Sequence, residues 1–180
     1  MAERETLAIG EVLFSIAGPI KLTRLEFSTS NINADTLSQV CQLCMVMNQN
    51  ITQLLLYTAR LSPELKMRII SPTGASDKDL VIELMAVLTL VQQALKTGDP
   101  LPAMLHTPLF AKSIEIARRR VNGGETAELF IRDGLGDEGL RKYVSVLNSL
   151  VQFLGALDEL VLVLKRAVGE SSDVMLMERV

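Results

Sequence analysis

The longest hydrophobic pattern in the chain lies near its C-terminus, between Asp137 and Gly169. Within it, apolar or aromatic residues recur at every third or fourth position without a break, at Leu140, Tyr143, Leu147, Leu150, Leu154, Leu157, Val161, Leu164 and Val168. This spacing predicts a single amphipathic helix with one continuous apolar seam. At about 1.5 Å per residue the helix would be about 50 Å long, so other helices must pack along it to cover the seam.

Shorter helical patterns precede this one and are separated by stop signals. We expect helices over Glu3–Ala17 (ended by Gly18 and Pro19), from Asn33 or Asp35 to Leu61, over Pro63–Ile70, from Ser76 to Thr97, from Thr107 to about Arg120, and over Glu125–Arg132. Together they predict an all-α fold, a helical bundle of about five to seven helices with one long C-terminal helix. Residues 1–170 are expected to form a single domain, followed by a short tail over residues 171–180.

Two segments carry more specific structural predictions. From Leu80 to Leu95 the chain is apolar on nearly every side of a helix, which predicts the central helix of the bundle. Glu83 is the exception, and we expect it to point outward, since an inward acid would need a partner. Between Asp99 and Pro108 the prolines exclude a regular helix. This segment is expected to cross the end of the bundle in extended form, with the following residues tucked in: Leu101, Met104 and Leu105.

The composition changes this picture little but excludes several functions. Aromatic residues make up only 4% of the chain and there is no Trp, which favours helix packing over sheet. The net charge of −3 argues against a nucleic-acid partner, which would favour a basic excess. There is no run of eighteen apolar residues and no signal-peptide pattern, so a soluble, cytoplasmic chain without a membrane span is expected.

Two motifs suggest chemistry, but each has a simpler structural interpretation. Cys41 and Cys44 form a CxxC, which could serve redox or metal chemistry. They lie in an apolar helical run without a second CxxC, so we interpret them as packing residues in a reducing compartment. The run Arg118–Arg120 could bind phosphate or anionic lipid. Three consecutive arginines point in different directions around a helix, so we interpret them as a helix terminus instead.

No established catalytic motif is present. The chain has no Walker loop, GxGxxG, HExxH, GxSxG or Glu-x-x-His pair, so no cofactor and no metal are expected. Few polar residues are available to face into the bundle. The candidates for a pocket are Tyr57, Glu83, His106, Tyr143, Asn148 and Asp158. Asp158 and Glu159 are adjacent and diverge by about 100° on a helix, so they do not form a carboxylate dyad.

Several short stretches resemble one known family. Here they are Lys21–Glu26, Thr97–Pro102 with Thr107–Leu109, Arg141–Tyr143, Leu157–Leu160 and Gly169–Glu170. A C-terminal cytosolic domain of fungal membrane proteins contains similar stretches in the same order along its chain. Those proteins are similar to aromatic-acid exporters and are also described as brefeldin A sensitivity-related proteins or proposed endoplasmic-reticulum transporters. The chain departs from the family at Phe27–Ser30, where a Pro-Phe-Pro-like element is replaced, and it lacks the membrane half. The resemblance implies a helical module, as an excised fragment or a stand-alone relative, and brings no catalytic residues.

Two functions remain open from the sequence. The first is an accessory or interaction module that packs against a membrane-protein partner or another copy of itself, in the cytoplasm or at the cytosolic face of a membrane. It predicts an exposed apolar patch. The second is a stand-alone helical protein with an apolar pocket for a hydrophobic small molecule, either a carrier or a cofactor-free isomerase or cyclase. It predicts a cavity of about 300 Å³.

Overall fold

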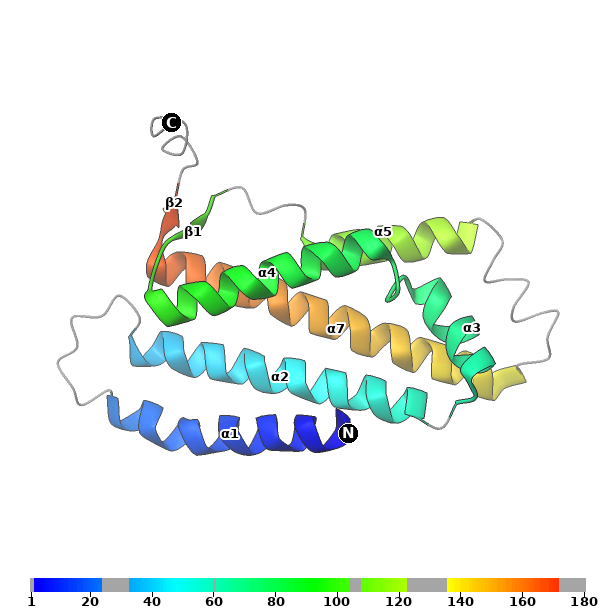
Figure 1. Ribbon diagram of the computed structural model, residues 1–180, viewed down its shortest axis with the longest axis horizontal. Coiled ribbons are helices and arrows are strands. Elements are labelled where there is room, and N and C mark those ends of the chain that lie inside the picture. The colour runs from blue at the N-terminus through cyan, green and yellow to red at the C-terminus, as the bar shows by residue number, and fades with distance from the viewer. Residues whose placement is uncertain (1, 24–32, 60, 104–107, 123–135, 172–180) are drawn as a thin grey trace.

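The fold is described from a computed structural model that covers residues 2–23, 33–59, 61–103, 108–122 and 136–171. Its elements are α1 (Ala2–Thr23), α2 (Ala34–Ala59), α3 (Pro63–Thr73), α4 (Lys78–Thr97), β1 (Leu101–Pro102), α5 (Leu109–Asn122), α7 (Gly136–Val168) and β2 (Glu170–Ser171). All but the two short strands are helices, which confirms the predicted all-α bundle (Figure 1). The expected helix over Glu125–Arg132 and most of the expected tail lie outside the described residues.

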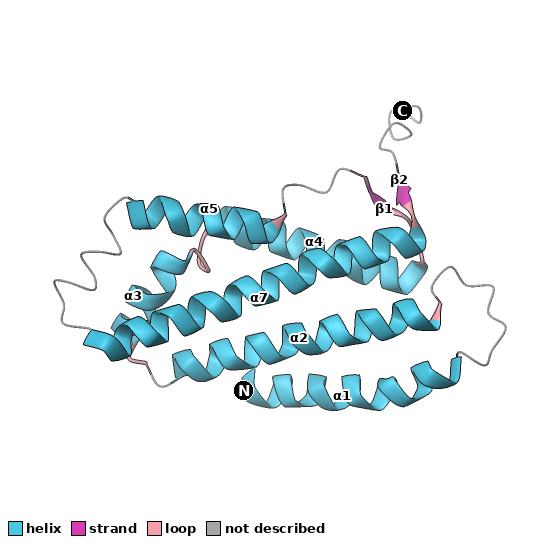
Figure 2. Cartoon of the chain, turned by 180° about the vertical axis from the view of Figure 1, so that it is seen from behind, coloured by secondary structure: helices cyan, strands magenta, loops and turns pink. Residues whose placement is uncertain are grey.

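The long helix α7 forms the centre of the bundle. Its predicted seam is confirmed, because the described positions are buried or half-buried and Leu154, Leu157 and Leu164 are fully enclosed. The helices α2, α3, α4 and α5 all contact α7, and α2 runs beside it over much of its length (Figure 1 and Figure 2). A single seam therefore organises the core.

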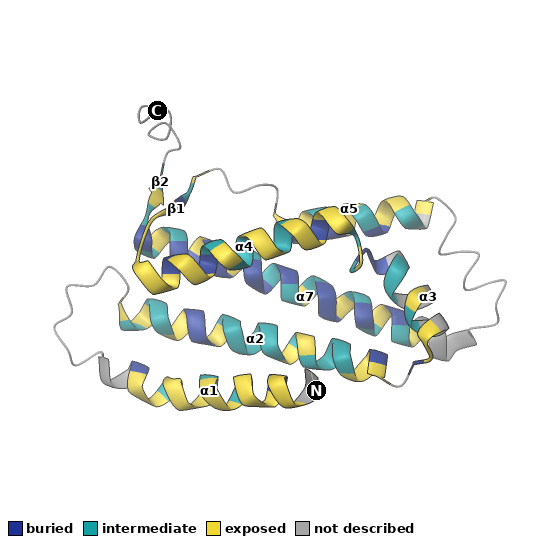
Figure 3. Ribbon diagram, in the orientation of Figure 1, coloured by how far each residue is buried: buried dark blue, intermediate teal, exposed yellow. Residues whose placement is uncertain are grey.

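The helix α4 is not central, contrary to the sequence-based prediction. Leu80, Val91 and Ala94 are buried toward α7, whereas Ile82 and Met85 on the other side are 66% and 58% exposed. In Figure 3 most of the visible face of α4 is coloured as exposed, while α7 behind it is largely buried. An apolar helix therefore covers the core with one side only, and the apolar side chains on its other side are partly or largely exposed.

The helix α1 lies outside α2 and is longer than predicted. It continues through Gly18 and Pro19 to Thr23 instead of ending at Ala17. Pro19 is exposed and so is Ser15, whose carbonyl would have met the missing N–H, so water can satisfy that carbonyl. A proline on the outer side of an edge helix is thus less disruptive than one facing the core.

The contact between α1 and α2 is narrow and made of small or medium residues. The side of α1 that meets α2 carries the more buried positions of this helix, namely Thr6, Gly10, Leu13, Ala17 and Ile20. Asn48 on α2 donates a hydrogen bond to the carbonyl of Thr6 at 3.0 Å. A Cβ atom on Gly10 would lie 3.4 Å from the Asn48 amide nitrogen, so the glycine permits the two helices to approach closely.

Several predicted helix ends are confirmed in detail. The Asn33 side chain accepts from the N–H of Thr36 at 2.8 Å and caps α2. Asp77 caps α4 by accepting from the N–H groups of Asp79 and Leu80 at 3.1 and 3.3 Å. Gly98, with φ of 74°, ends the same helix in the left-handed conformation. The helix α3 runs three residues beyond its predicted end, to Thr73.

The proline-rich connection is extended where it is described. Leu101 and Pro102 pair in parallel with Glu170 and Ser171 to form a minimal two-stranded sheet, and Leu101 is buried as predicted. The Lys165 ammonium donates to the carbonyl of Ala103 at 2.9 Å and lies 3.1 Å from the Glu170 carboxylate. The connection is therefore fastened to the end of α7. Met104 and Leu105, which were expected to be tucked in, lie outside the described residues.

Candidate functional site

A groove of about 360 Å³ runs between α2 and α7 and reaches the first turn of α5. Figure 2 shows α2 and α7 side by side and α5 beyond them. The groove is lined by Gln39, Gln42, Leu43, Val46, Phe110, Val151, Gln152, Gly155, Ala156, Glu159 and Val163. Ala156 and Val163 are buried, whereas the three glutamines and Glu159 are exposed. The groove thus has an apolar floor and a polar edge with a single ionisable side chain.

Phe110 is placed at the groove by two features of α7. The Asp158 carboxylate accepts hydrogen bonds from the N–H of Leu109 at 3.0 Å and from the N–H of Phe110 at 2.9 Å. It therefore caps α5 from a different helix, where the N-terminal helix dipole favours a negative charge. A Cβ atom on Gly155 would lie 3.7 Å from the Phe110 ring, an ordinary van der Waals distance, so Gly155 lies directly beside the ring and a larger side chain there would meet it.

The family model of the brefeldin A-sensitivity protein 4-like domain matches residues 1–172. The chain belongs to this family. The match covers all the described elements, which confirms the brefeldin A-sensitivity part of the resemblance seen in the sequence. The fungal origin and the membrane-protein context that the resemblance implied remain predictions. No curated protein and no solved structure matches the chain.

The predicted pocket residues of this brefeldin A-sensitivity protein 4-like domain do not gather in one place. Tyr57 is 41% exposed on α2, and Asn148 is exposed on α7. Tyr143 is buried in a small cluster with Leu61 and Val146, and this burial raises the pKa of its hydroxyl. His106 lies outside the described residues. None of the five described candidates lines the groove.

Glu83 does not point outward, and this expectation was wrong. Its carboxylate forms an ion pair with Lys112 on α5, and both side chains are mostly covered. One carboxylate oxygen, Oε2, is buried and accepts no hydrogen bond from the part of the chain that the structure describes. The partner that a buried acid requires therefore comes from the neighbouring helix, and the pair fastens α4 to α5.

The three consecutive arginines have different surroundings. Arg120 donates to the carbonyl of Ser71 and lies 3.3 Å from the Asp77 carboxylate, so it joins α5 to the start of α4. Arg119 pairs with Glu115 one turn earlier on α5, whereas Arg118 is exposed. Two of the three guanidinium groups therefore already contact acidic side chains of the same chain, in agreement with the helix-terminus interpretation.

The two cysteines are reduced and lie on α2. Cys41 is buried against α1, and its thiol lies 3.6 Å from the carbonyl oxygen of Leu13. Burial raises the pKa of the Cys44 thiol, and the nearby Cys41 raises it further. Both effects disfavour the thiolate, which is the reactive form, and agree with a packing role. Within the described ranges, no group of three or more His, Cys, Asp or Glu side chains is arranged to hold a metal ion.

Two helices are long and apolar enough to cross a membrane, judged by length and composition alone. They are α4 over Lys78–Thr97, with a mean hydropathy of 1.4, and the Arg141–Val168 part of α7, with 1.6. The expectation of no such segment was too strict, because it required an unbroken apolar run. Half of the α7 window is buried inside the fold, which is the behaviour of a core helix. In α4 only 17% is buried, and Leu84, Val87, Leu88 and Leu90 are partly buried against the core, whereas Ile82 and Met85 are exposed.

The groove could not be anticipated from the sequence. Its lining consists of glutamine, valine, alanine and glycine on helix surfaces, and such residues form no recognisable motif. The cap on α5 was also missed, because its acceptor lies 48 positions after Phe110 in the chain. Only the excess of apolar positions on α4 was visible beforehand, and it was assigned to the core.

Proposed function

We propose that this brefeldin A-sensitivity protein 4-like domain is an interaction module that docks on a partner protein through α1. The observation that supports the proposal is the number of large apolar side chains that α1 leaves uncovered. Phe14 is 76% exposed and Leu7 is 67% exposed, and the same helix also exposes Ile9, Val12 and Ile16. Single exposed apolar residues are ordinary, but five on one helix are typical of an interaction surface.

The exposed apolar residues lie on both sides of the α1–α2 contact. With 3.6 residues per turn, Leu7 and Phe14 lie on one flank of the contact, and Ile9, Val12 and Ile16 lie on the other. The side of α1 opposite α2 carries Arg4, Glu11 and Ser15, which are all exposed. We call the two apolar strips the flanks of α1. A polar outer ridge between two apolar flanks suits a helix of a partner that packs against α1 and α2 together.

A site-specific crosslinking experiment tests this proposal. A photo-crosslinking residue replaces Phe14 on a flank or Glu11 on the polar ridge, and both variants are irradiated in cells. The proposal predicts one dominant adduct at position 14 that is lost with Leu7→Ser, and a much weaker adduct at position 11. An adduct of twice the chain mass would identify a second copy as the partner. Equal labelling at both positions, or no adduct, would contradict the proposal.

A second candidate function is the binding of an apolar small molecule in the groove. Two properties of the groove support this function. Its volume of about 360 Å³ lies within the range of ligand sites, and its floor is apolar. Among the lining residues only Glu159 is titratable, so a carrier role is favoured over catalysis. A substitution Gly155→Leu would fill the groove beside Phe110. Loss of binding of an apolar fluorescent probe in this variant, but not in Gly155→Ala, would support the carrier.

A further inference from the structure

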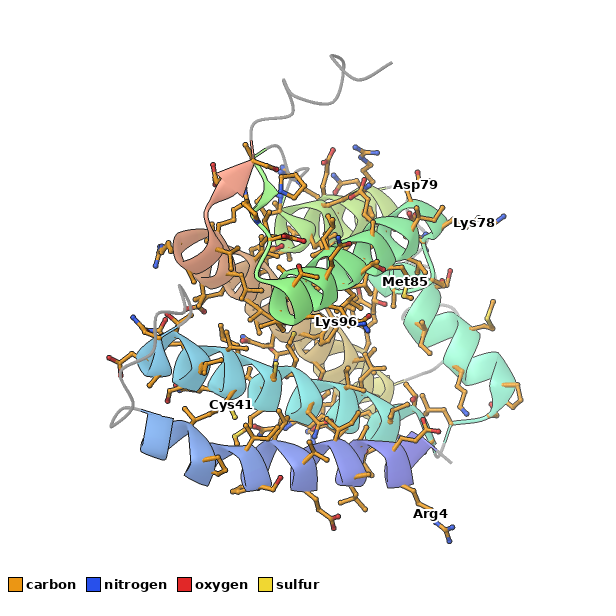
Figure 4. The ribbon with its side chains drawn as sticks, turned by 60° about the vertical axis from the view of Figure 1, so that its left-hand side comes forward. Arg4, Cys41, Lys78, Asp79, Met85 and Lys96 are labelled. Carbon is orange, nitrogen blue, oxygen red and sulfur yellow. The ribbon has the colours of Figure 1, made fainter. Side chains whose placement is uncertain are left out.

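The outward side of α4 carries exposed apolar side chains and a lysine near each end of the helix. On a helix of 3.6 residues per turn, one outward line contains Lys78, Ile82, Met85, Thr89, Gln92 and Lys96, and all six residues are exposed. We call this line the outer face of α4. Val81 is also exposed beside it. Figure 4 shows Lys78, Met85 and Lys96 on this helix. The line therefore has a cation at each end and only neutral residues between them, of which Ile82 and Met85 are apolar.

The acidic residues of α4 do not interrupt the outer face. Glu83 is turned toward α5 and paired with Lys112. Asp79 is exposed, but it lies about 100° around the helix from Lys78, away from the line. Lys78 and Lys96 are separated by eighteen positions, or about 27 Å along the helix. This arrangement is complementary to a partner whose interior is apolar and whose surface groups are negatively charged.

The helix cannot cross a bilayer in this fold, because both of its ends are fastened to the rest of the domain. At its start, Asp77 pairs with Arg120 of α5 at 3.3 Å. Just after its end, β1 pairs with β2, which follows α7. A helix held at both ends can still lie flat in the interfacial region of a membrane with its outer side chains inserted.

We propose that the outer face of α4 binds the surface of an anionic lipid bilayer, with Ile82 and Met85 inserted and Lys78 and Lys96 at the headgroups. This proposal concerns another helix and another kind of partner than the proposed function, and it does not depend on it. A second copy of the chain fits less well. One face of a helix of this length covers about 300 Å², less than half of the roughly 800 Å² per partner of a stable interface. Pairing of α4 with itself would also bring terminal lysines together in either direction.

The first test is sedimentation of the full chain with vesicles. We expect binding to vesicles of phosphatidylcholine with phosphatidylserine, and weak binding to phosphatidylcholine alone. Ile82→Ser with Met85→Ser should weaken binding at least about tenfold, because two inserted apolar side chains are lost. Lys78→Gln with Lys96→Gln should weaken binding to anionic vesicles by about 30-fold, that is, by about fivefold per lysine. The matched control is Leu7→Ser with Phe14→Ser, which removes equally exposed residues from α1.

The second test uses the absence of Trp from the sequence. A single Trp in place of Met85 should shift its emission to shorter wavelength when anionic vesicles are added, whereas a Trp in place of Phe14 should not. Circular dichroism of each variant verifies that the fold is retained. The proposal is overturned if the chain does not bind, if it binds neutral and anionic vesicles equally, or if the α1 and α4 variants lose binding to the same extent. It is also overturned if Ile82→Ser instead abolishes a concentration-dependent dimer.

Discussion

Asp158 on α7 and Phe110 on α5 are joined by a hydrogen bond of 2.9 Å from the backbone N–H of Phe110 to the Asp158 carboxylate. The second carboxylate oxygen accepts from the N–H of Leu109 at 3.0 Å. The acid thus satisfies two N–H groups that have no partner within their own helix. It also holds the Phe110 ring at the end of the groove, so one side chain links the stability of α5 to the shape of the candidate site.

Replacement of Asp158 should destabilise the domain. For Asp158→Ala we expect a loss of about 1–2 kcal/mol in the free energy of unfolding, the usual cost of removing a helix cap. Asp158→Asn should lose less, because it keeps one acceptor oxygen. Urea unfolding followed by circular dichroism measures the change. The exposed neighbour Glu159→Gln serves as the control and should change stability by about 0.5 kcal/mol or less. Equal effects at positions 158 and 159 would contradict the capping role.

The Glu83–Lys112 pair should couple α4 to α5. A double-mutant cycle with Glu83→Gln and Lys112→Gln is expected to give a coupling energy of about 1 kcal/mol. The value exceeds that of most surface pairs because each side chain is about three-quarters covered. The control cycle uses Glu115→Gln and Arg119→Gln, an exposed pair on α5 alone, with a coupling of about 0.5 kcal/mol or less. A coupling at Glu83 no larger than the control would argue against this prediction.

The sequence predicted those parts of the fold in which a helix is buried along one side or a side chain binds backbone groups nearby in the chain. The seam of α7 is periodic because its neighbours cover the same side of the helix along its length, so its pattern reports its burial directly. The cap at Asn33 is local and was equally readable. The position of α4 was predicted wrongly, since an apolar side chain looks the same in a sequence whether it meets the core or an external partner. The effect of Pro19 was predicted wrongly for a related reason. How strongly a proline destabilises a helix depends on whether the proline is exposed to water, and the sequence does not show this.

The candidate site was predictable only to a small extent. Asp158 was selected as a pocket acid, but the structure uses it as a cap, because the N–H groups it binds belong to a segment almost fifty positions earlier. Glu83 was expected in solvent, and only the packing of α5 on α4 reveals Lys112 beside it. The groove itself depends on how two helix surfaces meet. Such relationships arise from tertiary packing and leave no local pattern of residues.

The buried tyrosine should make stability depend on alkaline pH. Burial raises the pKa of Tyr143 above its ordinary value of 10.0, so the folded protein keeps this proton more tightly than the unfolded chain. The stabilisation is fully present below the pKa of the unfolded state and is lost as the pH rises above 10 toward the folded value. Urea unfolding between pH 8 and 11 should therefore show a steeper fall for the wild type than for Tyr143→Phe. Tyr57→Phe, at an exposed tyrosine, is the matched control, and a parallel fall in all three proteins would contradict the prediction.

Two leucines of α7 test whether burial in the core, and not apolar character alone, makes a side chain of this helix important for stability. Leu157 is fully enclosed in the seam, whereas Leu162 is 52% exposed. Leu157→Ala removes buried methyl groups and leaves a cavity, so it should cost about 2–5 kcal/mol in the free energy of unfolding. Leu162→Ala should cost about 0.5 kcal/mol or less, since alanine is a good helix former and no cavity arises. Thermal and urea unfolding of both variants provide the measurement. If the two substitutions destabilised the domain equally, the seam of α7 could not be the surface on which the other helices pack.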